Sequence, residues 1–173
     1  MPSVTKKFNT LKSNTGWTLS NFVGNAVAGT ATATSTGNNS TFSSVIPSNA
    51  IVTGIETQYL AHKQLDEESG GSVTVDNRII IPSVSTGTRQ LHVVTSSTST
   101  SPDIVSHGGT NNLQNLSGFT ISDLDNIEWF ATAIISSNTL VITSNLLTIG
   151  FPILSPVVTI HYNVPSLPIT RPR

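Results

Sequence analysis

Hydrophobic and polar residues alternate with a period of two along much of this chain, most clearly between residues 46 and 63. This period is typical of a β-strand with one face packed and the other in water. The face expected to be packed carries Ile55, Thr57, Tyr59 and Ala61. The opposite face is polar except at Leu60. Gly54 interrupts the pattern near its start, which predicts a β-bulge or a close approach of another backbone.

Similar alternation, or short apolar runs, predicts further strands between turns rich in Gly, Pro, Asn and Ser. The expected strands cover residues 25–36, 73–81, 90–95, 119–121, 127–135, 140–149 and 157–164. Residues 64–72 are expected to form a hairpin loop and residues 96–115 a long irregular loop. Ser122–Asn126 is expected to form one helical turn with Ser122 as its N-cap. Since no segment has the pattern of a long amphipathic helix, we predict an all-β fold, an antiparallel β-sandwich or jelly roll.

The 173 residues are enough for one domain with an apolar core. We expect an extended N-terminal arm over residues 1–12, a sandwich over 13–164, and a Pro-rich tail over 165–173. The hydrophobic fraction of 36% argues against disorder, despite the many Ser and Thr residues. Only 10% of the residues are charged, well below the roughly 25% of typical soluble proteins. This composition suits a β protein with a neutral, hydroxyl-rich surface.

The charges are unevenly distributed, although the net charge is only −1. The central body has three cationic and nine acidic residues, which leaves it at −6. Both ends of the chain are basic and could bind an acidic surface of a partner through electrostatic attraction. We predict that the partner-binding residues are Lys6, Lys7, Phe8, Lys12, Arg171 and Arg173. The alternative is that these charges only solvate the ends. Nucleic acid is not an expected partner, because the body is acidic.

No apolar run reaches the roughly 18 residues that a membrane-spanning helix requires, and no signal-peptide pattern opens the sequence. We therefore expect no membrane association and no export by the usual route. The absence of Cys excludes disulfides and thiolate metal sites.

The chain contains no nucleophile elbow and no phosphate-binding glycine loop, and its four His residues lack metal-ligand spacing. We assign no catalytic, cofactor-binding or metal-binding residue, and we expect no enzyme activity. Three clusters have alternative interpretations. Asp66–Glu68 is a Ca²⁺ loop or a solvated hairpin tip. Asp123, Asp125 and Glu128 provide a glycosidase-like carboxylate pair or the start of a helical turn. Trp17, Tyr59 and Trp129 form a sugar platform or belong to the core.

Four motifs carry a resemblance to a known group of proteins. Trp17 stands near the start, Ile46–Glu56 reads IPSNAIVTGIE, Phe119–Asn126 reads FTISDLDN before an apolar strand, and Val157–Tyr162 reads VVTIHY. In this order they resemble small bacteriophage virion proteins described as structural or tail proteins. The resemblance covers most of residues 17–164.

The resemblance implies a non-enzymatic β-sandwich component of a virus particle, assembled in the host cytoplasm. The expected function is that of a capsid decoration or cement protein that bridges neighbouring subunits of the phage head. Its partners would be the major capsid protein or other virion subunits, and it would form a homo-oligomer, with a trimer expected. One alternative is a tail or fibre component that binds a host glycan through the 96–115 loop and exposed aromatic residues. Another is a glycan-binding module or hydrolase outside any virus.

Overall fold

A computed structural model describes residues 1–8, 10–20, 23–34, 42–64, 73–96, 101–135, 139–143 and 156–166. These residues form eleven strands and two short 3-10 helices, η1 and η2. The elements are β1 (Ser3–Lys7), β2 (Thr10–Ser20), β3 (Val23–Thr34), η1 (Phe42–Ser44), β4 (Ile51–Gln64), β5 (Val73–Ile81), β6 (Ser85–Thr86), β7 (Gln90–Val93), β8 (Asp103–Gly108), η2 (Ser122–Asn126), β9 (Glu128–Ile135), β10 (Thr139–Thr143) and β11 (Val157–Asn163).

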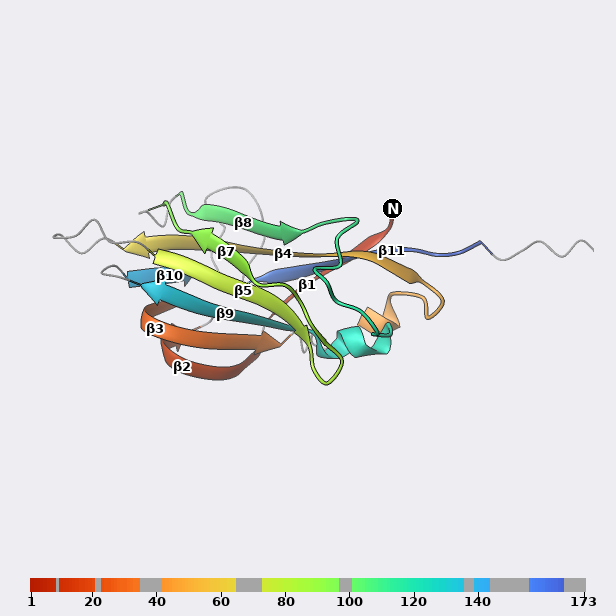
Figure 1. Cartoon of the computed structure of the whole chain (residues 1–173), viewed down its shortest axis with the longest axis horizontal. Helices are drawn as coiled ribbons and strands as arrows, with labels where there is room; N and C mark the ends of the chain where they lie inside the picture. Colours follow the sequence, from red (N-terminus) through yellow and green to blue (C-terminus); the bar gives the residue numbers. More distant parts are fainter. Residues whose placement is uncertain are drawn as a thin grey trace, which may run out of the picture.

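The strands form two antiparallel sheets of four strands that pack as a β-sandwich (Figure 1). One sheet has the order β1-β11-β4-β8, and the other has the order β2-β3-β9-β5, with the short strands β6 and β7 paired to β5. Strand β10 pairs with β4 and also with β3, so it joins the two sheets through backbone hydrogen bonds. The predicted all-β antiparallel sandwich is confirmed.

Strand β4 is central to its sheet and has the face pattern that the sequence predicts. Ile55, Thr57, Tyr59 and Ala61 are all buried between the sheets. Leu60 is buried as well, although it lies on the opposite face of the strand. The outer face of β4 is therefore partly buried rather than fully exposed to solvent.

The expectation for Gly54 is also confirmed. Gly54 pairs with His161 of β11 while Val52 pairs with Tyr162, so Thr53 is the extra residue of a β-bulge. On its other side, Gly54 lies against the backbone of residues 109–110, where no side chain would fit. The glycine thus permits both the bulge and the close approach.

The core lies between the sheets and is built mostly from alternate residues of β4, β5, β9 and β11. Its largest fully buried side chains are Trp129, Phe8, Phe42, Ile46, Ile55, Ile79, Ile81, Leu116, Leu124, Ile127 and Ile160. Pro82 ends β5, as expected, because proline cannot donate a ladder hydrogen bond. On the outer face, the guanidinium of Arg78 stacks 4.7 Å from the ring centroid of Phe130.

The N-terminal segment is part of the sandwich, which corrects the expectation of an arm over residues 1–12. Ser3–Lys7 forms β1 and pairs antiparallel with β11. Phe8 follows and is fully buried, and residues 10–12 already belong to β2. The boundary expected between residues 12 and 13 therefore falls inside a strand.

The strands around two of the predicted loops differ from the expectation. Residues 64–72 do not join hairpin partners, because β4 pairs with β8, β10 and β11, whereas β5 pairs with β6, β7 and β9 in the other sheet. Within the predicted 96–115 loop, Asp103–Gly108 forms strand β8. The residues of β8 that face inward include the polar Asp103 and His107. The strand therefore has no alternation of hydrophobic and polar residues from which it could have been predicted.

The segment before β9 departs from the expected strand. Phe119–Ile121 is not a strand but a connection that turns into η2. The helical turn Ser122–Asn126 is present, but Ser122 is not its cap. Instead, the carboxylate of Asp123, within the turn, accepts hydrogen bonds from the amide and the hydroxyl of Thr120, at 2.6 and 2.7 Å. These bonds stabilise the start of the turn.

Candidate functional site

A pocket lies at the end of the sandwich where the two short helices η1 and η2 are found; Figure 1 shows the position of these helices. The first wall is the segment that leads into β4. A turn closes here through the amide of Ala50, which donates to the carbonyl of Pro47 at 2.9 Å. This turn places Ser48, Ala50 and Val52 along one side of the pocket.

The opposite wall is residues 113–121, which are held against the sandwich by Gln114. The Gln114 side-chain amide donates to the carbonyl oxygen of Ile55 at 2.9 Å, and the backbone carbonyl of Gln114 accepts from the amide of Thr88 at 2.8 Å. Gln114 and Asn115 both have positive φ angles, 53° and 62°, and Gly118 has a φ of 70°. This left-handed backbone folds the segment around the pocket.

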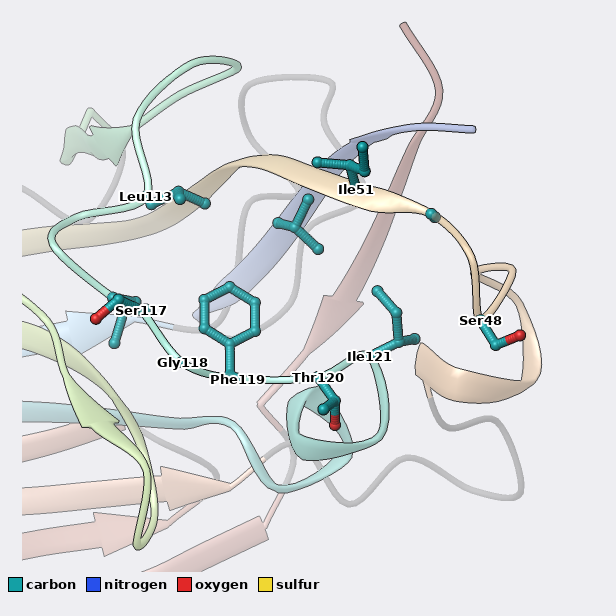
Figure 2. Close-up of a pocket in the computed structure, with 11 residues that line it drawn as sticks. Ser48, Ile51, Leu113, Ser117, Gly118, Phe119, Thr120 and Ile121 are labelled. Carbon is teal, nitrogen blue, oxygen red and sulfur yellow. The ribbon is translucent and has the colours of Figure 1, made fainter. Parts of the chain in front are cut away.

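The pocket has a volume of about 540 Å³, within the range of small-ligand sites. None of its eleven lining residues carries a charge. Figure 2 shows the side chains of Phe119 and Ile121 pointing from their loop toward β4. The hydroxyls of Ser48, Ser117 and Thr120 are the polar groups among the lining side chains. This arrangement can accept an uncharged, apolar group.

An exposed apolar surface lies beside the pocket on the outer side of β4. Ile51 is 60% exposed, Met1 64% and Val164 46%. They are brought together by neighbouring contacts, because Asn163, next to Val164, pairs with Ile51, and the hydroxyl of Thr53 donates to the sulfur of Met1 at 3.2 Å. We call Met1, Ile51 and Val164 together with the pocket the apolar end.

The structure separates the residues predicted to bind a partner. Phe8 is 0% exposed and therefore belongs to the core rather than to a binding surface. Lys7 is exposed on β1. Lys6 lies 4.7 Å from the ring centroid of Phe42; burial lowers its pKa, while the nearby charge of Asp125 acts in the opposite direction. Lys12 is in β2, but its side chain, like Arg171 and Arg173, lies outside the part of the chain that the structure describes.

The acidic residues around η2 have structural partners. Asp125 accepts from the amide and the hydroxyl of Ser43, at 2.9 and 2.6 Å, and so ties η2 to η1. The hydrogen bonds from Thr120 lower the pKa of Asp123. Both carboxylates lie in the first turn of η2, as expected. Glu128 is buried in β9, and Asp66–Glu68 lies outside the described residues.

A polar cluster closes the side of the sandwich between β7 and β8. Asp103 accepts hydrogen bonds from the amide and the hydroxyl of Thr95, from the amide of Ser96 and from His92 Nε2, at 2.6, 2.8, 3.1 and 3.0 Å. Burial alone would raise the pKa of Asp103, but these hydrogen bonds together lower it. Burial, and then the charge of His92, lower the pKa of His107.

The aromatic residues of the described core do not form a sugar platform. The rings of Tyr59 and Trp129 pack 5.3 Å apart between the sheets, and both are buried. The hydroxyl of Tyr59 accepts a hydrogen bond from Asn77 Nδ2 at 3.1 Å, and burial raises its pKa. The interpretation as core is confirmed for these two residues, while the side chain of Trp17 is not described.

Neither a metal centre nor a membrane span is found in the described part of the chain. No group of three or more His, Asp or Glu side chains is arranged there to hold a metal ion. Within the same ranges, no helix is long and apolar enough to cross a membrane.

His161 is buried on β11 with its Nε2 3.4 Å from a carboxylate oxygen of Glu56.

Sequence reasoning did not find the apolar end. Its one signal was the exposed pair Ile51 and Val164, each at the boundary of a strand, but single apolar residues at strand ends are common on protein surfaces. Comparison with protein families, with curated proteins and with solved structures finds no match for this chain. The resemblance to phage virion proteins therefore stays a prediction.

Proposed function

We propose that this protein is a non-enzymatic structural subunit of a bacteriophage particle, a capsid decoration protein that bridges neighbouring subunits of the head. The observation that carries the proposal is the apolar end. An exposed apolar surface continuous with an apolar pocket is typical of a site of protein–protein contact.

The location of the resembling motifs supports the same proposal. Ile46–Glu56 contains one wall of the pocket, Phe119–Asn126 contains part of the other, and Val157–Tyr162 is the strand beside Ile51. Three of the four motifs thus contribute to the apolar end or lie next to it. A subunit of this kind works by burying apolar area, and several weak contacts in an oligomer add up through avidity.

The charge distribution favours a partner with an acidic surface. Lys7 is exposed on β1, the edge strand next to β11, and no other described strand pairs with β1. A lysine on an edge strand also discourages uncontrolled strand pairing. Lys7 pairs with Val157, at the other end of β11 from Asn163, so a partner that contacts both the apolar end and Lys7 would present an apolar region and a separate acidic region.

The proposal is tested with two variants on intact particles. Ile51→Asp introduces a charge into the apolar end, and Leu91→Asp is the matched control, since Leu91 is 63% exposed on β7. With the wild type and with Leu91→Asp, we expect gold-labelled antibody to mark the whole head. With Ile51→Asp, we expect no label on the head. Label only at the tail tip would favour the tail or fibre alternative, and unlabelled particles would reject a virion role.

A further inference from the structure

The chain leaves the sandwich directly beside its own pocket. The last residue of β11, Asn163, pairs with Ile51, which lines the pocket. Residues 164–166 are exposed and continue past the end of the sandwich (Figure 1). The sequence that follows adds Leu167, Pro168 and Ile169.

We propose that the segment Val164–Ile169 of one copy inserts into the pocket of a second copy. The inference rests on the proposed function, in which copies of this chain assemble, and it names the contact that joins them. Each copy then provides one segment and one pocket, so the contact is head-to-tail and closes into a ring when the rotation between copies permits it.

The chemistry of segment and pocket is complementary. The pocket has an uncharged lining of about 540 Å³, and the segment offers aliphatic side chains at Val164, Leu167 and Ile169. Val164 is 46% exposed in the isolated chain and would become buried. The hydroxyl of Thr120 already donates to Asp123, so the segment would be recognised mainly through the apolar lining of the pocket.

Proline in the segment favours a second copy over insertion into its own pocket. Pro165 and Pro168 fix their backbone φ near −65° and favour an extended chain. Because residues 164–166 run away from the sandwich, a return to the same pocket would need a sharp reversal within about five residues. An extended segment reaches a neighbour without that reversal.

Charge supports the same arrangement. Beyond Ile169 the chain carries Arg171 and Arg173, and the body of each copy between its basic ends has a net charge of −6. Asp123, which accepts from the pocket residue Thr120, provides a carboxylate at the border of the pocket. An inserted segment would bring its arginines over this acidic body.

Disulfide trapping tests the contact directly, because the chain has no cysteine of its own. We would mix two separately tagged single variants, Ser117→Cys at the pocket and Ile169→Cys in the segment, and oxidise them. A disulfide between residues 117 and 169 of different copies is expected. The control mixture pairs Ile169→Cys with Leu91→Cys, an exposed site on β7, and should give no such product. A 117–169 product no stronger than the control product would overturn the proposal.

Sedimentation velocity provides the second test. The double variant Leu167→Asp/Ile169→Asp should shift from oligomer to the mass of one copy, whereas Thr170→Asp, with a charge at a polar position nearby, should sediment like the wild type. An unchanged oligomer in the double variant, or a wild type that stays monomeric, would reject the segment–pocket contact. Wild-type particles that carry no label, while the wild type is an oligomer in solution, would instead reject the virion role and leave this contact standing.

Discussion

A Cβ atom on Gly54 would lie 1.9 Å from the carbonyl oxygen of Gly109. The atoms it would meet belong to the backbone, so no side chain can rotate away. The turn itself is fixed, because the amide of Ile55 donates to the carbonyl of Asn112 at 2.9 Å. We expect Gly54→Ala to reduce the free energy of unfolding by about 3 kcal/mol, the upper part of the usual cost of overpacking. Urea unfolding measures this loss.

Gly118→Ala is the control for that variant. Nothing lies within 4 Å of a Cβ built on Gly118, and its φ of 70° costs an alanine about 1 kcal/mol. A loss in Gly54→Ala no larger than that in Gly118→Ala would show that the 109–112 turn moves to make room for the added Cβ and would contradict the prediction.

Phe8 is a core residue, and its removal is expected to unfold part of the sandwich. Its side chain is fully buried, and its amide donates to the carbonyl of Pro156 at 2.8 Å, directly after β1. Phe8→Ala should lower the free energy of unfolding by about 3–5 kcal/mol. Lys7→Ala, one residue earlier and exposed, should change it by less than about 0.5 kcal/mol. If Phe8→Ala and Lys7→Ala had the same melting temperature in a thermal melt, residues 1–8 would be an arm outside the core rather than part of the sandwich.

The pattern of apolar residues predicts which face of a strand is buried, but it does not predict which strand pairs with it. In β4, β5 and β11 the apolar residues recur at every second position, so the buried faces follow directly from the sequence. The pairing of β4 with β8, β10 and β11 has no such signal, because a period of two is the same for every possible neighbour. The wrong hairpin at 64–72 is the result, since adjacent strands in sequence are the default expectation.

The missed elements share a different cause. The inward positions of β1 are Val4 and Lys6, and those of β8 include Asp103 and His107, so neither strand has a hydrophobic alternation. The pocket depends on the left-handed backbone at Gln114 and Asn115, which residues other than glycine rarely adopt. Local sequence rules therefore did not predict the loop that forms its second wall.

The hydrogen bond between Asn77 and Tyr59 is a buried contact between the two sheets. Asn77 Nδ2 lies 3.1 Å from the Tyr59 hydroxyl. Tyr59→Phe removes the acceptor and leaves Asn77 with its second bond, to the carbonyl of Gln90 at 3.2 Å. The expected loss is about 1 kcal/mol. Tyr162→Phe is the matched control, because no described residue hydrogen-bonds to the Tyr162 hydroxyl, and a loss as large as that of Tyr59→Phe would contradict the assignment.

The polar cluster at β7 and β8 predicts how stability depends on pH. The pKa of His107 is lowered in the folded protein, first by burial and then by His92, while in the unfolded chain it has its ordinary value near 6.5. The unfolded chain therefore binds more protons as the pH falls through this value, and the free energy of unfolding decreases until the pH passes the lowered pKa of the folded state. Below that pH the loss is complete.

Asp103 gives a second step at lower pH. Despite its burial, its hydrogen bonds lower the pKa below the ordinary 3.8, so its stabilising contribution is present above that value and is lost as the pH falls through the folded pKa. Urea unfolding at a series of pH values from about 7.5 to 3 should show both steps. The variant His107→Gln should flatten the first step and leave the second, because the hydrogen bonds of Asp103 come from His92, Thr95 and Ser96. A first step of the same size in His107→Gln would assign it to another group.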